Sequence, residues 1–486
     1  MPAENYLRNL DKGVRGLSSR RSLLALADLA AARSLEIYLV GGTVRELVLG
    51  RPSPDLDLAV SSQTLDLARD LAQTLGGTFV LLDEKERTAR VVWGKEILDL
   101  AEFRAPTLEG DLRGRDFTLN ALALDLKAVL GRRALELVDP LGGLADLKQG
   151  LIRMVAPENL AYDPLRLLRA YRFAATHGLV ISPETARAIG QYVALFPRVA
   201  GERVHQELFL LLGAPRAAPV LREMDRIGLL NQVLPELADM KGVAQDGFHH
   251  LDVFHHALET VAHLEEVLAR PQDFFGELTP EVARYAAAAP RPVLLKLAAL
   301  FHDVGKPQVQ ERRQDPDRYT FYYHEKVGVE IFTAAALRLR MSNEESRAVV
   351  KLIQLHMRPF LLMPLFRRGR LSIRALGRLV RAARRDLPGL FTLAMADSLA
   401  AQGSQKPPDS EQTLADLADA AYRFLKERLE PQELQPRLLS GHDLIKVLGL
   451  QPGPRFRHLL TAVEEAQWEG DVTTREEALK LVRRLL

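Results

Sequence analysis

The sequence predicts an α+β protein, with a small mixed sheet and its helices at the N-terminus followed by a long all-helical region. Three short β-type runs, at 78–82, 89–93 and 96–103, follow a helical pattern at 65–75, and another helical pattern covers 19–33. Beyond residue 116, apolar residues recur at helical spacing almost to the C-terminus. The change of periodicity therefore separates a sheet-containing head from a helical remainder.

A chain of 486 residues is too long for one hydrophobic core and indicates three or four domains. From the proline and glycine breakers we expect a head over 1–150, a helical neck over 151–240, a third domain over 241–400 and a helical tail over 401–486. The stretch 402–409, QGSQKPPD, is polar and proline-rich, which predicts a linker.

The composition narrows the class of protein. Hydrophobic residues make up 47% of the chain and charged residues 26%, as in globular proteins. There is no cysteine, which excludes disulfides, a thiolate nucleophile and cysteine-ligated zinc. No run approaches about 18 apolar residues, so we expect no membrane span and a cytoplasmic location. Net charge is only +2, so contacts with nucleic acid must come from local basic patches. The oligomeric state is not indicated.

The most informative segment is 37–60, where two β-type runs flank a glycine turn. The first run ends in Gly41 and Gly42, and Arg45 follows. The second run contains Asp55 and Asp57, whose side chains lie on one face of a strand and can hold a pair of Mg²⁺ ions for nucleotidyl transfer. Glycines let backbone N–H groups approach a triphosphate, and the arginine adds donors. Either half alone could be a plain turn or a strand with solvated acids, but the combined order favours a nucleotide site.

Two further sets of polar residues follow. Arg115 and Asp116 are predicted to open a helix, with Asn120 one turn later, and can bind a ribose hydroxyl and a phosphate. A second set shares one helix face at spacings of three and can read a nucleobase edge by hydrogen bonds; it consists of Asp163, Arg166 and Arg169. An ordinary charged first turn and a surface ion pair are the plain alternatives.

Taken together, these motifs resemble the class II tRNA nucleotidyltransferases, the family of CCA-adding enzymes and bacterial poly(A) polymerases. The resemblance implies a polymerase-beta-like palm, Mg²⁺, and transfer from CTP and ATP to the tRNA 3′ end, with Asp163 and Arg166 choosing the base without a template. The chain departs from the family pattern at three positions, with Glu46 for the usual Asp, Gly114 for an Arg and Tyr162 for a Glu.

The resemblance leaves the exact product open. The region after Asp57 lacks the basic, hydrophobic stretch of poly(A) polymerases, which favours tRNA as substrate, although poly(A) synthesis stays an alternative. The segment between Arg104 and Arg115 is short, a mark of relatives that add only CC. A third acidic ligand could be Asp99 or Glu102.

A second set of histidines and carboxylates occurs in the order H…HD…H…H…D. Such side chains are the expected ligands of a divalent transition metal or Mg²⁺. The order resembles the HD phosphohydrolase domain. That resemblance implies a ligand set with two auxiliary histidines, namely His256, His302, Asp303 and Asp397, with His324 and His356 as the auxiliary pair. His255 could replace its neighbour, and a purely structural role is the alternative. A rival interpretation of the whole chain is a phosphohydrolase with a regulatory nucleotide-binding palm, or an RNA-binding protein without catalysis.

One basic stripe stands out in the helical region. Four arginines recur along one helix face, namely Arg374, Arg378, Arg381 and Arg385. Such a stripe can follow an A-form phosphate backbone, and a solvated helix face is the alternative.

Overall fold

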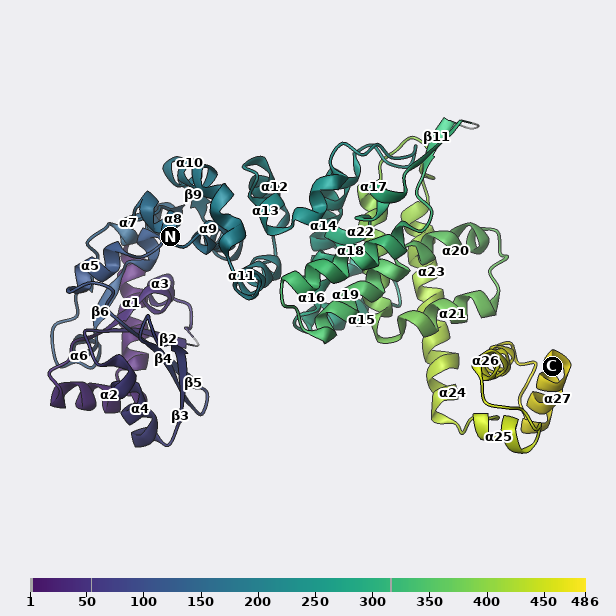
Figure 1. Cartoon of the computed structure of the whole chain (residues 1–486), viewed down its shortest axis with the longest axis horizontal. Coiled ribbons are helices and arrows are strands. Elements are labelled where there is room, and N and C mark those ends of the chain that lie inside the picture. The colour runs from purple at the N-terminus through teal and green to yellow at the C-terminus, as the bar shows by residue number, and fades with distance from the viewer. Residues whose placement is uncertain (1–2, 54, 315–316) are drawn as a thin grey trace. The chain divides into compact units, whose positions relative to one another are not determined.

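The computed structural model describes residues 3–53, 55–314 and 317–486, and the chain divides into two compact units (Figure 1). The N-terminal unit runs to residue 200 and takes in 227–229, and the helical unit comprises 201–226 and 230–486. The expected neck over 151–240 is therefore shared between the two units. Each unit is described by itself.

A seven-stranded mixed sheet forms the centre of the N-terminal unit, in the order β3-β4-β5-β2-β1-β6-β7. Its strands are β1 (Ile37–Val40), β2 (Asp55–Val60), β3 (Thr78–Asp83), β4 (Thr88–Trp93), β5 (Glu96–Glu102), β6 (Ala123–Asp125) and β7 (Leu137–Val138). Only β2 and β5 pair in parallel; the other neighbours are antiparallel. The expected mixed sheet is confirmed. β6 and β7 were not expected, because two or three residues are too few to show a period of two.

Helices accompany this sheet in the same unit. They are α1 (Ala3–Leu17), α2 (Arg21–Ala32), α3 (Gly41–Leu49), α4 (Thr64–Leu75), α5 (Leu108–Arg113), α6 (Leu126–Val129), α7 (Gly143–Gln149), α8 (Pro157–Tyr162), α9 (Leu165–His177) and α10 (Pro183–Tyr192). α2 and α4 match the helical patterns predicted at 19–33 and 65–75. The prediction that a helix opens at 115–116 is wrong. Only a 3₁₀ turn, Thr118–Asn120, forms there, because the chain enters β6 directly afterwards.

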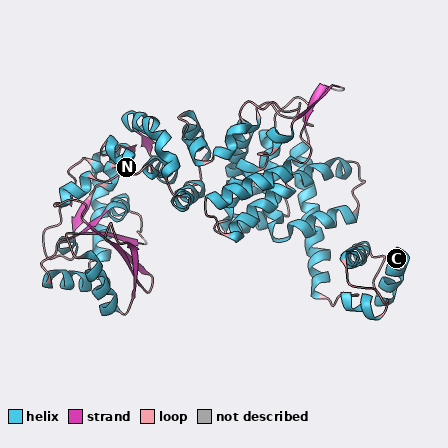
Figure 2. Ribbon diagram, in the orientation of Figure 1, coloured by secondary structure: helices cyan, strands magenta, loops and turns pink. Residues whose placement is uncertain are grey.

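The remaining residues are almost entirely helical (Figure 2). Residues 201–340 contain α11 (Gly201–Gly213), α12 (Ala218–Arg226), α13 (Leu229–Val233), α14 (Val253–Ala269), α15 (Thr279–Ala287), α16 (Arg291–Phe301), α17 (Lys306–Val309) and α18 (His324–Arg338). Further along lie α19 (Asn343–Leu355), α20 (Met357–Arg367), α21 (Ile373–Ala383), α22 (Leu387–Ala400), α23 (Ser410–Phe424), α24 (Glu430–Leu434), α25 (Gly441–Lys446), α26 (Pro454–Glu469) and α27 (Arg475–Leu485). Nearly every residue of α22 is buried, as its apolar composition on all sides predicts. A hairpin of β10 (Glu311–Gln314) and β11 (Asp317–Thr320) was not expected.

The stretch 402–409, predicted to be a linker, is hydrogen-bonded to a distant loop of the helical unit. The N–H of Gly403 donates to the carbonyl of Phe248 at 2.8 Å, and that of Gln405 donates to the carbonyl of Gly247 at 3.0 Å. The segment is therefore irregular in backbone conformation, as its polar and proline-rich composition predicts, but hydrogen bonds to residues 247 and 248 hold it in place.

Among the described residues, one helical stretch, Asn343–Arg367, is long and apolar enough to cross a membrane by length and composition alone. It comprises α19 and α20, and a core helix of a globular protein passes the same test. A single such stretch is weak evidence, and the expected cytoplasmic location stays a prediction.

Candidate functional site

Three carboxylates share one face of the sheet in the N-terminal unit. Asp55 and Asp57 are two residues apart on β2, and the parallel register places Asp99 of β5 opposite Asp57. Burial and the charge of Asp99 raise the pKa of Asp57. Arg90 of β4 donates to both oxygens of Asp99, at 2.7 and 2.8 Å. This concentration of negative charge fits a divalent cation held by oxygen ligands.

The other proposed third acid, Glu102, has a different role. It pairs with Val60 in the register, so its side chain points to the opposite face from Asp57. Its carboxylate accepts a hydrogen bond of 3.2 Å from the N–H of Thr64, the first residue of α4. Glu102 therefore caps a helix, and Asp99 is the carboxylate that lies beside the pair.

The glycine turn lies directly against the carboxylate face. Gly41 has a φ of +59°, which favours glycine, and α3 begins at this residue. A Cβ added at Gly42 would lie 2.8 Å from Oδ2 of Asp57, and one added at Gly41 would lie 2.9 Å from Nη1 of Arg115. The absence of side chains thus lets a carboxylate and a guanidinium approach the N-terminus of α3, an arrangement suited to phosphate binding.

Thr43, which no pattern in the sequence indicated, joins this turn to the strand. Its buried hydroxyl accepts a hydrogen bond of 2.7 Å from the N–H of Asp57 and donates to the carbonyl of Asp55 at 3.4 Å. The residue follows the glycine pair immediately, but nothing in its spacing indicated a partner on the next strand.

Arg115 lies between the turn and the following segment. Its Nη2 donates to Oδ2 of Asp111 at 3.0 Å, and Nη1 donates to the carbonyl of Asn120 at 3.4 Å. The side chain is held on one side while Nη1 faces Gly41.

A chain of hydrogen bonds connects Arg45 to α9. Buried Arg45 donates through Nη1 to Oδ1 of Asn120 at 2.5 Å and through Nε to Glu46 at 2.9 Å. Asn120 donates to Oδ1 of Asp116 at 3.0 Å, and the other oxygen of Asp116 accepts from Nε of Arg169 at 2.9 Å. Residues from three predicted motifs therefore form one network.

The network closes on itself through the end of α9. Nε2 of His177 lies 2.9 Å from Oε1 of Glu46, and the Arg45 guanidinium lies over the Phe173 ring, 4.7 Å from its centroid. Arg169, Phe173 and His177 are four residues apart, so all three lie on one face of α9. Neither Phe173 nor His177 was predicted, because their partners are more than a hundred residues away.

Two carboxylates of this network stay ionised far into acid. Burial alone would raise the pKa of Glu46, but His177 and Arg45 outweigh it and lower that pKa to about 2. The pKa of Asp116 is likewise about 2, because Arg169 and Asn120 outweigh the effect of burial. Both are therefore fixed negative partners of the surrounding arginines.

The predicted base-reading residues do not all share one helix face: Asp163 follows the last residue of α8 in extended conformation, and only Arg166 and Arg169 lie on α9, because the helix begins after Pro164. Arg166 is buried, and its Nη1 donates to the carbonyls of Gly114 at 3.0 Å and Asn159 at 3.2 Å. Burial lowers the pKa of this guanidinium. Oδ1 of Asp163 accepts from the N–H of Leu165 at 3.3 Å. Tyr162, in the position of the usual Glu, is 79% exposed. In this chain it is therefore the two backbone carbonyls that orient Arg166.

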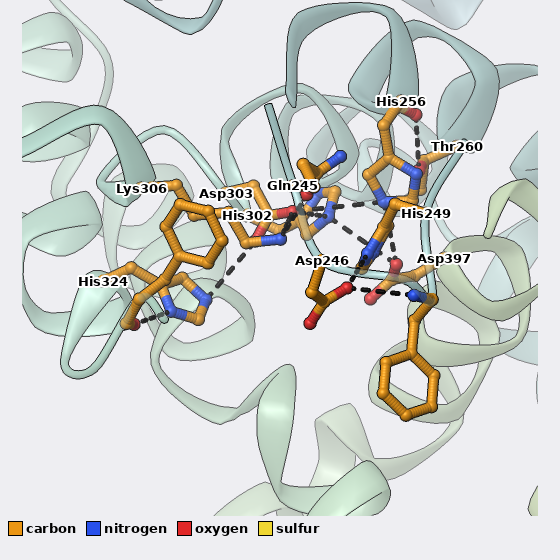
Figure 3. A network of polar contacts seen from close by, with 12 residues as sticks. Gln245, Asp246, His249, His256, Thr260, His302, Asp303, Lys306, His324 and Asp397 are labelled. Carbon is orange, nitrogen blue, oxygen red and sulfur yellow. Dashed lines mark hydrogen bonds and ion pairs between the residues drawn. The ribbon is translucent and has the colours of Figure 1, made fainter. Parts of the chain in front are cut away.

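In the helical unit, Asp303 lies at the centre of the predicted histidine set (Figure 3). Its Oδ2 is 3.2 Å from Nε2 of His302 and 2.6 Å from Nζ of Lys306. Its Oδ1 is 3.3 Å from Nε2 of His324 and 3.7 Å from Nε2 of His356. One buried carboxylate thus has potential ligands at both oxygens, which is the arrangement of a residue that bridges two cations.

The remaining predicted ligands complete one side of this centre. Nε2 of His256 lies 3.0 Å from Oδ1 of Asp397, and Nε2 of His302 lies 3.8 Å from the same oxygen. His256 is fully buried, whereas the side chain of His255 is 57% exposed and bonds to Asp252 at the start of α14. The choice between the neighbouring histidines therefore falls on His256.

Backbone carbonyls fix the orientation of three imidazoles. The Nδ1 atoms of His302, His324 and His356 lie 2.7–2.8 Å from the carbonyls of Ala299, Phe321 and Ile353. Because a carbonyl only accepts, Nδ1 carries the hydrogen and Nε2 is left to bind a cation. Within the part of the chain that is described, buried Nε2 of His302 has no hydrogen-bond partner, so this nitrogen is available to a divalent metal.

Charge within the centre supports the same interpretation. Burial disfavours a charged His302, yet Asp303 and Asp397 raise its pKa to about 9. Burial lowers the pKa of His256 to about 4. Without a metal, the ionised Asp303 and Asp397 thus keep a proton on the His302 imidazole, and a bound cation would replace that proton. His249, missed in the sequence, offers a ligand atom beside His256 and Asp397.

The arginine stripe is exposed, but three of its four guanidinium groups are paired with acids of the same unit. On α21, Arg374 donates to Glu469 at 2.6 Å and Arg378 donates to Glu465 at 2.5 Å, and Arg381 pairs with Glu464. All three acids belong to α26, which packs against α21. The ion pairs could not be predicted, because helical spacing shows that arginines share a face but not which charges lie opposite. Binding of RNA by this stripe stays a prediction. Arg385 lies beyond α21 and is exposed.

Three known families match successive parts of the chain. Residues 37–153 match the Poly A polymerase head domain, 178–241 the probable RNA and SrmB-binding site of polymerase A, and 253–422 the HD domain. A solved CCA-adding enzyme in complex with CTP shares the fold, with a TM-score of 0.64 at 20% identity over 98% of both chains.

Curated relatives match along nearly the whole length. An A-adding tRNA nucleotidyltransferase of Deinococcus radiodurans is 38% identical over 92% of this chain and 94% of the relative. A CC-adding tRNA nucleotidyltransferase of Thermus thermophilus is 37% identical over 91% of this chain and 92% of the relative. With the carboxylate face, the glycine turn and the matched domains, this similarity shows that the chain belongs to the tRNA nucleotidyltransferase family.

Proposed function

We propose that the chain transfers nucleotidyl groups from CTP or ATP to the 3′ end of tRNA. The observation that carries this proposal is the carboxylate face of Asp55, Asp57 and Asp99 beside the glycine turn at the start of α3. The Deinococcus and Thermus relatives, which match over more than nine tenths of the chain, are named for this class of reaction.

Asp55 and Asp57 are the proposed Mg²⁺ ligands, with Asp99 as a third carboxylate. When bound, Mg²⁺ supplies activation of the tRNA 3′ hydroxyl and neutralises charge on the leaving pyrophosphate. The N–H of Gly41 donates to the carbonyl of Leu122, so the N–H groups that follow it in the first turn of α3, together with Nη1 of Arg115, are proposed to bind phosphate oxygens. Thr43 keeps the turn and the strand in register, so that triphosphate and carboxylates stay aligned.

Arg45 acts mainly through its neighbours. Because it is buried and bonded to Asn120 and Glu46, it positions the segment around Asp116 and leaves little of its guanidinium for the triphosphate. Each side-chain polar atom of Asp116 and Asn120 already has a partner, so these residues are proposed to bind a ribose through the second lone pair of Oδ2 of Asp116 and the second N–H of the Asn120 amide. Arg169 anchors this segment to α9.

Base choice is proposed to lie with Asp163, between α8 and α9, and with Arg166 in the first turn of α9. Arg166 is held by the carbonyls of Gly114 and Asn159, and a rigid side chain discriminates better than a mobile one. Hydrogen bonds to a base edge can reject a wrong base strongly, because the mismatched base leaves buried groups unpaired.

Among the forms of the reaction, the short segment before Arg115 favours addition of CC. In the structure this segment forms α5, capped by Thr107, in place of a long loop. The relatives named for A addition and for CC addition are almost equally similar to the chain, so they support neither form over the other.

One assay tests both levels of the proposal. Purified protein is incubated with tRNA lacking the last three nucleotides, or with tRNA ending in CC, and with labelled CTP and ATP singly and together. Two added C residues and no A are expected. Incorporation of A alone onto tRNA ending in CC would overturn CC addition but keep the nucleotidyltransferase, and long A tails would favour poly(A) synthesis. No incorporation with any nucleotide would contradict the proposal.

For the helical unit we propose a metal-dependent phosphohydrolase. The central position of Asp303, with Nε2 atoms at both oxygens, supports a two-cation centre. Imidazole ligands favour Ni²⁺, Zn²⁺ or Fe²⁺ over Mg²⁺, and the carboxylates of the centre also allow Mn²⁺. Nζ of Lys306 lies 2.6 Å from Oδ2 of Asp303 and donates to Oε1 of Gln245 at 2.7 Å. When bound cations neutralise the carboxylates, this ammonium group is placed to bind a substrate phosphate.

A further inference from the structure

We propose that His249 is an additional ligand of the metal centre in the helical unit, binding a cation through Nε2 together with His256 and Asp397. This inference rests on the metal-dependent function proposed for that unit. His249 precedes α14 by only a few residues and was not part of the histidine set predicted from the sequence.

The position of His249 meets the requirements of a ligand. One potential ligand atom from each of His249, His256 and Asp397 lies within 4.8 Å of the others. The His249 ring stands edge-on to the His256 ring, with centroids 4.7 Å apart and an interplanar angle of 89°. His256 and Asp397 are buried, whereas His249 is partly exposed, so it is the outermost member of the group.

A carboxylate fixes which nitrogen of His249 is available. Nδ1 lies 2.9 Å from Oδ1 of Asp246, and this oxygen also accepts from the N–H of Phe248 at 3.2 Å. The ionised carboxylate only accepts, so Nδ1 of His249 carries the hydrogen and Nε2 keeps its lone pair. A carboxylate behind a histidine is the usual support of a metal ligand, because it sets the tautomer and the ring orientation. Figure 3 shows Asp246 and His249 beside Asp397.

The backbone around His249 is held from outside its loop. Gly403 and Gln405, in the stretch that follows α22, donate to the carbonyls of Phe248 and Gly247. A Cβ added at Gly403 would lie 2.2 Å from the Gly247 carbonyl oxygen and 2.6 Å from the His249 nitrogen, so only glycine fits this contact. α22 carries Asp397, and the stretch directly after it holds the backbone beside His249. One continuous segment of chain therefore positions both Asp397 and His249. A loop fixed to this degree suits a ligand.

The test measures metal binding by the full-length protein. Metal-free protein is titrated with Mn²⁺ and with Ni²⁺ in a calorimeter, and bound metal is counted by elemental analysis. His249→Phe keeps the edge-on ring but removes the nitrogens. Loss of even a supporting group typically costs 10–100-fold in metal affinity, so we expect at least about tenfold weaker binding. Asp246→Asn should weaken binding less, because its amide oxygen can still accept from Nδ1.

His250→Ala is the matched control, since His250 is the exposed neighbour of His249, and it should bind metal like the unaltered protein. Circular dichroism and CTP incorporation verify that each variant is folded. Unchanged metal affinity in His249→Phe, with affinity lost in His302→Ala, would overturn the role of His249 and keep the centre. No metal bound by the unaltered protein would overturn both the centre and its additional ligand.

Discussion

The two units assemble acidic residues in opposite ways. In the N-terminal unit, Asp55 and Asp57 come from one strand, and the neighbouring strand adds Asp99. In the helical unit, Asp303 and Asp397 come from segments almost a hundred residues apart and lie among buried imidazoles. The first centre offers oxygen ligands and suits Mg²⁺, which keeps several waters; the second offers nitrogen ligands and suits a transition metal.

The difference also concerns how each centre is supported. Arginines balance the carboxylates of the N-terminal unit, as Arg90 does for Asp99. In the helical unit, backbone carbonyls orient the imidazoles, and Lys306 is the close cation at Asp303. The two centres therefore depend on different residues, and variants can disable one while the other is kept.

The largest expected effect is in the strand-borne centre. Asp57→Ala or Asp55→Ala removes a proposed metal ligand and should reduce CTP or ATP incorporation by about 10³-fold or more, which corresponds to roughly 4 kcal/mol of transition-state stabilisation. Incorporation is measured on a gel with labelled nucleotide. The protein should stay folded, because both side chains lie on the sheet face at only partial burial. Near-normal incorporation in either variant would remove the basis for this site.

The reciprocal variant changes the helix-borne centre. His302→Ala combined with Asp303→Ala should abolish binding of Mn²⁺ or Ni²⁺ in that unit and any hydrolysis of 2′,3′-cyclic nucleotides. CTP incorporation should fall less than about twofold, since no residue of the carboxylate face is altered. Loss of both activities in a protein with normal circular dichroism would mean that the two centres are not independent.

A smaller effect is expected on base choice. Asp163→Ala should reduce discrimination among the four nucleoside triphosphates by roughly 10–200-fold, with a smaller loss of rate for the correct one. Tyr162→Glu is the control: Tyr162 is exposed and Arg166 is already held by carbonyls, so selectivity should be retained. Competition assays with mixed nucleotides measure both. Unchanged selectivity in Asp163→Ala would exclude it as the reader.

The basic stripe should contribute little to tRNA binding. Arg378 is paired with Glu465, so Arg378→Ala should change tRNA affinity less than about twofold and leave its salt dependence unaltered. Exposed Arg385 offers the comparison: if it contacts a phosphate, Arg385→Ala lowers the slope of log affinity against log salt by about one. Filter binding at several salt concentrations distinguishes the two. A reduced slope in Arg378→Ala would restore the stripe as an RNA surface.

The smallest effect concerns acid stability of the N-terminal unit. The pKa values of Glu46 and Asp116 are about 2, below their ordinary values of 4.5 and 3.8. The folded state therefore binds fewer protons, and the stability that these groups contribute is present above about pH 4.5 and is lost as pH falls towards 2. Glu46→Gln with Asp116→Asn should flatten thermal stability against pH over that interval. An unchanged slope would show that other carboxylates dominate.

The parts of the site that were predicted share a short sequence range. Asp55 and Asp57, two residues apart, could be placed on one face because a strand alternates with a fixed period. Thr43 and His177 could not be found, since their partners are set by strand register and helix packing. The arginines of α21 show the same limit, because the glutamates of α26 that pair with them lie about ninety residues further along. Composition misled at 402–409, where polarity indicated a linker but backbone bonds to Phe248 and Gly247 hold the segment in place.

The closed network along α9 has a mechanical consequence. The helix of 13 residues rises about 1.5 Å per residue and is therefore about 20 Å long. Its first turn carries Arg166. Its last residue, His177, is hydrogen-bonded to Glu46 of α3, the helix that begins at the glycine turn. α9 is therefore anchored at both ends, through Arg166 to the carbonyl of Gly114 and through His177 to Glu46 of α3. Because the same helix joins the proposed base-reading residue to the helix that begins at the glycine turn, a substitution at either anchor should change base selectivity and nucleotide affinity together.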